Sequence, residues 1–294
     1  MKMDLDAAVS FVATRGRVLD RRRLRLLLGA GAPDDVLAAL DAYRNPDGGY
    51  GWALEPDQRS ATSQPVAAMH ALEVLADIRD TKSRRPVQLC DWLSGYTLPD
   101  GGVPFGLPNS DTAGSAKHWV DADATVSSLQ MTTQLAAQAH RLARQRADIA
   151  EHSWLATATA YCLDRIDQIV DTPHAYEVMF AMRFLDAVTG HDSQARALID
   201  RLIPYVVSDG PTPVTGGAEG EALHLLDFTP HTDAPSRMSF TANAITADLA
   251  RLAAQQQPDG GWTVDYTMYS PAAELEWRAY ATIQAIATLR GARL

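Results

Sequence analysis

The chain has 294 residues, of which 46% are hydrophobic and 21% are charged, so it is long enough to bury a sizeable core. Its formal net charge of −10 excludes the basic footprint of a nucleic-acid-binding protein and opposes general adsorption to anionic membranes. A neutral or apolar ligand fits this balance better. The only cysteines, Cys90 and Cys162, lack CxxC spacing, which argues against a disulfide framework or a thiolate zinc site.

Targeting signals are weak. The first 16 residues lack the apolar core of a signal peptide, and no run of about 18 apolar residues occurs. We therefore expect a cytoplasmic protein without an integral membrane segment. The Arg-rich amphipathic segment 18–28 is either a solvated helix face or a patch for a diphosphate or a membrane surface, so peripheral membrane contact stays open.

Hydrophobic periodicity predicts helices along the whole chain, and no β-alternation of useful length interrupts them. Start signals such as Pro33-Asp34 and breakers of Pro, Gly and Asp mark their ends. The predicted helices are 4–14, 18–28, 34–43, 64–78, 84–93, 123–144, 151–166, 175–188, 194–206, 241–256 and 272–290. The fold class is therefore predicted to be all-α.

Three breaker clusters recur with a regular spacing. They are centred on Asp47, Asp100 and Asp259, which lie 53 and then 159 residues apart, the second interval being three times the first. A fixed period of this length is typical of repeated helical hairpins that cannot bury their apolar faces alone. We predict further turns near positions 153 and 206. Five to six hairpins would close into a single α/α toroid over 1–294, with two helical layers around a central pocket.

Two acidic pairs lie in predicted loops. Asp121 and Asp123 come just before a predicted helix, so they are either a helix cap or an acid site. Glu55 and Asp57 could bind a divalent ion, orient a substrate hydroxyl or cap the helix that begins near Gln64. A third polar group, His224, Asp227, His231 and Asp233, has spacings that fit no single helix, so no metal site is predicted.

The turn motifs resemble a known superfamily. Asn45-Pro-Asp-Gly-Gly-Tyr50, Pro99-Asp-Gly-Gly-Val103 and Gln257-Pro-Asp-Gly-Gly-Trp262 look like the repeats of squalene-hopene cyclases and class II terpene cyclases, and like the Gly-Gly turns of protein prenyltransferase β subunits. The resemblance runs over nearly the whole chain and implies the α/α toroid fold. The zinc-ligand pattern of the prenyltransferases is not evident, because neither cysteine lies in an Asp-X-Cys context.

The segment Trp119-Val-Asp-Ala-Asp-Ala-Thr125 looks like the Asp-X-Asp-Asp-Thr motif that follows such a turn in the cyclases, with Ala124 in place of the second consecutive Asp. The resemblance implies that Asp123 protonates an alkene or epoxide and that Asp121 supports it. Protonating carbon requires an acid whose proton is held in a dry pocket. Glu55-Pro-Asp57 with Gln64-Pro65, and the segment 270–277, also look like a bacterial group with prenyltransferase or squalene-cyclase repeats.

A carbocation must be shielded from water and stabilised by aromatic faces. Side chains in or beside the predicted loops could bind the substrate in this way, although aromatic residues after Gly-Gly also serve as packing plugs between hairpins. The candidates are Trp52, Glu55, Asp57, Phe105, His118, Trp119, Phe228, Trp262, Tyr266, Tyr269 and Trp277.

The sequence thus favours a class II terpene cyclase-like enzyme that protonates an isoprenoid or polyene to start cyclisation or isomerisation. It requires no redox cofactor, and Mg²⁺ would matter only for a diphosphate substrate. One alternative is a non-catalytic barrel that holds an isoprenoid or other lipid. Another is a carbohydrate-active barrel that uses Glu55, Asp57 and the Asp121/Asp123 pair as acid and base.

Overall fold

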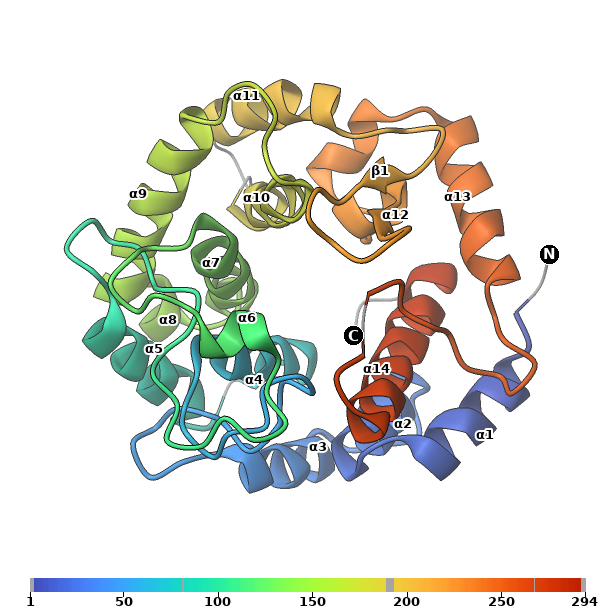
Figure 1. Cartoon of the computed structure of the whole chain (residues 1–294), viewed down its shortest axis with the longest axis horizontal. Coiled ribbons are helices and arrows are strands. Elements are labelled where there is room, and N and C mark those ends of the chain that lie inside the picture. The colour runs from blue at the N-terminus through green and yellow to red at the C-terminus, as the bar shows by residue number, and fades with distance from the viewer. Residues whose placement is uncertain (1–2, 81, 189–192, 267, 292–294) are drawn as a thin grey trace.

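Two concentric layers of helices form a ring in the computed structural model, which describes residues 3–80, 82–188, 193–266 and 268–291. Figure 1 shows the outer layer running around the ring and the inner helices surrounding its centre. The outer helices are α1 (Leu5–Arg15), α3 (Pro33–Leu40), α5 (Arg85–Tyr96), α9 (Ser153–Asp167), α11 (Ser193–Leu202) and α13 (Ala242–Ala254). The inner helices are α2 (Val18–Leu27), α4 (Pro65–Asp77), α7 (Leu129–Ala143), α10 (Ala175–Val188), α12 (Leu225–Phe228) and α14 (Pro271–Leu289). The predicted all-α toroid is confirmed.

Short elements fill the connections. They are α6 (Lys117–Val120), α8 (Ala147–Ala150), the 3-10 turns η1 (Asp41–Tyr43), η2 (Ile203–Tyr205) and η3 (Pro235–Ser239), and an antiparallel pair of strands, β1 (Thr212–Pro213) and β2 (Ala222–Leu223). The sequence predicted loops at α6, α8 and α12. Each of these helices has only four residues, too few to show a helical period.

The three Gly-Gly turns share one geometry. In each, the first glycine is left-handed, with φ of 92° at Gly48 and Gly101 and 91° at Gly260. The preceding aspartate accepts a hydrogen bond from the backbone N–H of the second glycine, at 2.9 to 3.2 Å. A Cβ on that second glycine would lie 2.7 to 2.8 Å from an aromatic ring of an outer helix, namely Trp92, Tyr161 or Phe11. The repeat is therefore a device that docks each turn on an outer helix.

The third of these turns closes the ring, because the outer helix it meets is α1 at the other end of the chain. A Cβ on Gly260 would lie 2.2 Å from the carbonyl oxygen of Ala7. Gln256 and Asp4 exchange two hydrogen bonds of 2.7 Å between the Gln256 side chain and the Asp4 backbone. Trp262 packs in a buried cluster with Phe11 and Ile283. Both ends of the described chain thus contribute to one closure.

The predicted period fails at one position. Residue 153 begins the outer helix α9, and the crossing to the inner layer comes later, at 168–174. Helix α8 lies in the connection from the inner helix α7 to the outer helix α9. Its residues lengthen this connection and move the next crossing further along the chain. Residue 206 follows η2 and does lie in a crossing segment, the one that leads from α11 to β1.

Candidate active site

Two inner helices face each other with polar side chains at helical spacing. On α4, His70, Glu73 and Asp77 are all buried. On α14, Tyr280 and Gln284 both donate hydrogen bonds to Glu73 Oε1, at 3.0 and 2.8 Å. Residues three, four and seven apart share one face of a helix, so these side chains form a polar seam between α4 and α14.

Two arginines, the buried Arg23 and the partly exposed Arg141, neutralise this seam. Arg23 of α2 lies 2.8 Å from Asp77 Oδ2 and 3.3 Å from Glu73 Oε1. Arg141 of α7 lies 2.7 Å from Asp77 Oδ1. Burial alone would raise the pKa of Glu73, but Arg23 and His70 outweigh it and hold that pKa below its ordinary value. Buried charges are tolerated when they are paired in this way.

Asp57 differs from these acids because no arginine forms an ion pair with it within the described chain. Like Glu73, it has one buried oxygen without a hydrogen-bond partner. Its side chain is 4% exposed, and Oδ2 accepts a 2.7 Å hydrogen bond from Trp277 Nε1. Oδ1 is buried without a hydrogen-bond partner among the described residues. Burial, aided by the nearby Glu55 carboxylate, raises the pKa of Asp57 to about 6 despite the hydrogen bond from Trp277. A buried carboxyl with a free oxygen and a raised pKa can hold and donate a proton.

The loop that carries Asp57 is strained and tightly held. Trp52 and Ala53 are consecutive left-handed residues that are not glycine, with φ of 58° and 61°. Such conformations persist only where the surroundings enforce them. Arg17 Nη1 donates to the carbonyl oxygens of Ala53 and Leu54 at 3.2 and 3.0 Å. The Asp57 carbonyl accepts a 2.8 Å bond from the Ala116 N–H, which fixes the acid against the loop before α6.

Glu55 reaches α4 from the same loop. Its Oε2 lies 2.8 Å from His70 Nε2, and His70 Nδ1 lies 3.5 Å from Glu73 Oε2. Burial alone would lower the pKa of His70, but its hydrogen bonds to Glu55 and Glu73 raise it above the ordinary value. The imidazole therefore links the acidic loop to the charged seam.

Aromatic rings surround the Asp57 side of the seam. The Trp277 ring makes edge contacts with Tyr266, Tyr280 and His70, at centroid distances of 5.3, 5.6 and 6.0 Å. Burial raises the pKa of Tyr266 and that of Tyr280 well above the ordinary value, so both phenols stay neutral. The residues Trp277, Tyr266 and Tyr280 are each partly exposed.

A second aromatic group lies beside α6. Phe105 stacks on Trp119 with centroids 4.5 Å apart and planes 9° apart. The His118 ring lies 4.9 Å from Trp119 and 5.8 Å from Tyr269. The backbone of Tyr269 lies near Asp57 and acts to lower the pKa of that carboxyl, against the larger effect of burial. The structure thus brings the predicted residues Phe105, His118 and Trp119 to the same end of the ring as Asp57.

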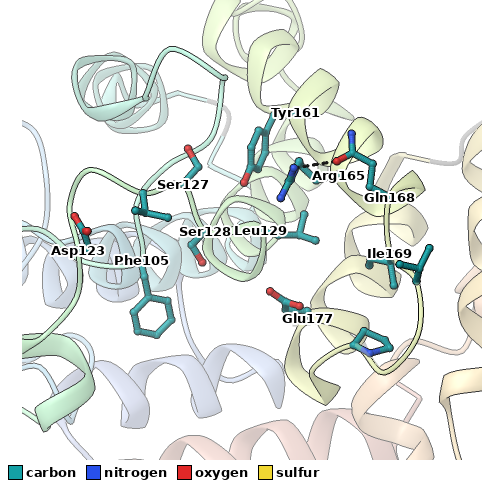
Figure 2. Close-up of a pocket in the computed structure, with 13 residues that line it drawn as sticks. Phe105, Asp123, Ser127, Ser128, Leu129, Tyr161, Arg165, Gln168, Ile169 and Glu177 are labelled. Carbon is teal, nitrogen blue, oxygen red and sulfur yellow. Dashed lines mark hydrogen bonds between the residues drawn. The ribbon is translucent and has the colours of Figure 1, made fainter.

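An open depression of about 630 Å³ lies where the loop after the second Gly-Gly turn meets α7, α9 and α10. Figure 2 shows Asp123 and Phe105 at one end of it and Arg165, Gln168 and Ile169 at the other. Arg165 donates a 2.9 Å hydrogen bond to Gln168 there. The depression is lined by both polar and apolar side chains, and Asp123 at its edge is exposed.

Asp121 and Asp123 do not have the surroundings that the sequence-based acid role requires. Both are exposed, and Asp121 forms an ion pair with Lys117. Asp123 Oδ1 accepts hydrogen bonds from the Thr125 hydroxyl and N–H, which lower the pKa of Asp123. The exposed Asp123 carboxylate, with its lowered pKa, stays ionised at neutral pH. The helix-cap interpretation also needs correction, because α7 begins at Leu129 and its N-cap is Ser128, whose hydroxyl accepts from Met131 N.

Three other predicted binding residues lie away from this site. Phe228 is fully buried in the main core, and Trp262 is buried at the ring closure with its Nε1 bonded to the Leu252 carbonyl. Both are packing residues. Trp52 is 54% exposed and donates to Asn45 Oδ1. No hydrogen bond or ion pair joins the two acidic pairs to each other within the described chain.

The sequence analysis missed His70, Glu73 and Tyr280. The available signal was the i, i+3, i+7 spacing of His70, Glu73 and Asp77 within an otherwise apolar helix. Polar side chains on an apolar face require partners, and a helical wheel would have shown them on one side.

Within the described ranges, no group of three or more His, Cys, Asp or Glu side chains is arranged to hold a metal ion. No helix there is long and apolar enough to cross a membrane.

Fold and site together define an α/α toroid that holds a buried carboxyl among aromatic rings. Solved structures of the type II terpene cyclase MstE from Scytonema share this fold. A variant bound to its product merosterolic acid A aligns with a TM-score of 0.58 at 12% identity, over 97% of this chain and 95% of that one. A variant bound to its substrate geranylgeranyl dihydroxybenzoate gives 0.57 at 13%, over 97% and 95%. The apo enzyme gives 0.56 at 15%, over 97% and 96%.

The resemblance in fold to class II terpene cyclases is thereby confirmed. No family model matches the chain, and no curated protein matches its sequence.

Proposed function

We propose that this chain is a class II terpene cyclase-like enzyme in which Asp57 protonates an isoprenoid or polyene. The observation that carries the proposal is the free, buried Oδ1 of Asp57, whose carboxyl is oriented by Trp277. The sequence-based assignment placed this role on Asp123, supported by Asp121. The surroundings of Asp57 favour it instead, because a proton donor to carbon must be dry and protonated.

The chemistry follows from the contacts. The Asp57 proton adds to a substrate double bond, and the electron pair of that bond forms the new C–H bond and leaves a carbocation. The carboxylate that results keeps its hydrogen bond from Trp277 Nε1. The faces of Trp277, Tyr266 and Tyr280 stabilise the cation as it moves along the chain. The final carbocation loses a proton to water and gives a cyclic or rearranged isomer of the substrate. Asp57 regains a proton from water, so protons balance and no cofactor takes part.

The proposed substrate class is a prenyl chain with trisubstituted double bonds. MstE, whose fold is shared, binds geranylgeranyl dihydroxybenzoate, and this compound is the first probe to test. Squalene is the second probe, because it has the same kind of double bond and no polar end. An isomer of unchanged mass and altered retention in liquid chromatography with mass spectrometry identifies cyclisation.

The deciding experiment compares Asp57→Asn with Asp123→Asn. Asparagine keeps the shape of each side chain and removes its acidic proton. We expect Asp57→Asn to lower turnover by about 10²- to 10⁴-fold, the usual contribution of a positioned general acid. Asp123→Asn should retain turnover. If Asp123→Asn lost turnover and Asp57→Asn retained it, the catalytic acid would be Asp123.

Recovery of the intact probe, bound but unchanged, from the wild-type chain would instead support the binding-only alternative. Native mass spectrometry after incubation distinguishes these outcomes, because a bound isomer and the bound probe can be released and separated.

A further inference from the structure

A third inner helix carries a stripe of partly exposed side chains. On α10, Tyr176, Phe180 and Arg183 are spaced by four and three residues and so share one face. All three are half-buried, while their neighbours Val178, Met179, Ala181, Met182 and Phe184 are buried. The stripe is therefore the partly exposed side of α10, where Arg183 contacts α12 through the carbonyl oxygen of Asp227.

The side chains of the stripe change from aromatic to charged along α10. Tyr176 lies in the first turn of α10, and Arg183 lies seven residues further, which is about 10 Å along the axis. On α14, Trp277 and Gln284 are also seven residues apart, and Trp277 is the one that contacts Asp57. Aromatic side chains thus lie toward the helix starts, near the acid, and charged or amide groups lie deeper in the ring.

Among the described arginines at this deep end, Arg183 forms no ion pair, although its charge opposes the effect of burial on the pKa of the nearby Asp227 carboxyl. Arg23 and Arg141 both contact Asp77. Arg183 donates from Nε to the carbonyl oxygen of Asp227 at 2.7 Å, and its guanidinium lies 5.6 Å from the centroid of Phe180. Neither Nη1 nor Nη2 has a hydrogen-bond partner among the described residues.

The neighbouring carboxylate is otherwise engaged. Asp227 Oδ2 accepts a 2.7 Å bond from the His224 N–H as part of the cap of α12. Tyr280 also lies within electrostatic reach of Arg183, and its phenol is neutral. The two free nitrogens of Arg183 form a fork of the kind that binds a carboxylate through two parallel hydrogen bonds.

We propose that Arg183 binds the carboxylate of an isoprenoid acid and so holds the polar end of the substrate deep in the ring. A prenyl chain then runs past Phe180 and Tyr280 toward Asp57. A diphosphate fits less well, because it carries several negative charges and the other arginines of the seam are already neutralised. The inference names the substrate of the proposed cyclase, but the contact itself is a binding event that does not depend on turnover.

The test measures binding of two probes that differ only at the polar end, geranylgeranoic acid and geranylgeraniol. Isothermal titration calorimetry on the full chain at pH 7.5 should show that the wild type binds the acid about tenfold more tightly than the alcohol, as a charge-assisted pair predicts. Arg183→Gln should reduce this preference to about twofold or less. Arg183→Lys, which keeps the charge but loses the fork, should give an intermediate preference.

The matched control is Arg165→Gln in the open depression, which should leave the preference unchanged. A loss of preference in Arg165→Gln with none in Arg183→Gln would place the carboxylate in the depression and overturn the proposal. Equal affinity of the wild type for acid and alcohol would overturn it without any variant. Because the readout is binding, Asp57→Asn should keep the preference, so failure of the proposed catalytic role and failure of this inference remain distinguishable.

Discussion

At the scale of single residues, the surroundings of a carboxyl decide its chemistry more than the motif that contains it. Asp123 lies in the segment that resembles the cyclase acid motif, yet its exposed carboxylate bonds to Thr125. Asp57 lies in no such motif, yet it is buried beside Glu55 and oriented by Trp277. Desolvation favours the neutral form of an acid, so burial makes Asp57 a proton donor.

The raised pKa of Asp57 predicts a pH dependence of stability with a definite sign. In the unfolded chain Asp57 ionises near pH 4, whereas in the folded chain its pKa is about 6. Between these values the folded state binds more protons, so this residue makes the protein less stable as the pH rises from 4 to 6. Asp57→Asn removes the effect, and we expect the variant to gain up to about 3 kcal/mol relative to the wild type over that range. Urea unfolding at pH 4, 5, 6 and 7 measures it.

Asp123→Asn is the control, because the pKa of Asp123 is shifted in the opposite direction from that of Asp57. Its folded pKa is lowered, so ionised Asp123 contributes stability above the unfolded pKa and loses it as the pH falls. The Asn variant should therefore gain nothing between pH 4 and 6. Turnover of the wild type should also decrease above pH 6 as Asp57 ionises, and a rate that increases through pH 6 would contradict the assignment of Asp57 as the acid.

At the scale of elements, the start of α7 separates the Asp123 loop from the helix that the sequence assigned to it. Ser127 bonds to Asp100 of the second Gly-Gly turn, and Ser128 caps the helix two turns later than predicted. Residues 121–127 are thus free to form a surface loop at the depression.

Removing this cap should weaken the helix. Ser128→Ala leaves the Met131 N–H without its partner and should lower the free energy of unfolding by about 1 kcal/mol. Asp123→Ala should leave it nearly unchanged, because Asp123 is exposed and lies outside the helix. Chemical denaturation of both variants checks this, and an equal loss in the two would restore Asp123 as the cap.

At the scale of the whole molecule, the closure between the third Gly-Gly turn and α1 completes the ring. Trp262, Phe11 and Ile283 bury one cluster there, and Arg278 holds Asp259 with hydrogen bonds of 2.7 and 3.0 Å. Arg23 lies on α2 near the start of the chain, and Tyr280 lies on α14 near its end. Ring closure brings these two helices into contact. Closure is therefore a condition for assembling the site.

Gly260→Ala tests this closure. Its left-handed φ of 91° costs an alanine about 1 kcal/mol, and the added Cβ would lie 2.2 Å from the Ala7 carbonyl oxygen. We expect a total loss of at least about 3 kcal/mol, since overpacking adds to the backbone strain. Gly216→Ala is the control, because Gly216 has φ of 78° and open space around it, and it should lose only about 1 kcal/mol. Thermal unfolding measures the loss of stability in both variants. Equal losses would mean that the contact between the third Gly-Gly turn and α1 accommodates the added Cβ without a loss of stability.

The sequence by itself determined the helices, the all-α class and the toroid. Apolar periodicity is local, and the Pro-Asp-Gly-Gly turns repeat the same short-range hydrogen bonds. The sequence also predicted Glu55, Asp57, Phe105, Tyr266 and Trp277 as site residues, because they lie in or beside the loops that follow those turns, and the structure places them at one end of the ring.

Only the tertiary structure decided which carboxyl is dry and which arginine is free. The bond from Trp277 to Asp57 joins residues that are 220 apart in the sequence, and the bond from Arg183 to Asp227 joins residues that are 44 apart. Burial and pairing depend on these distant neighbours, and a carboxyl in a linear sequence carries no mark of whether water will reach it.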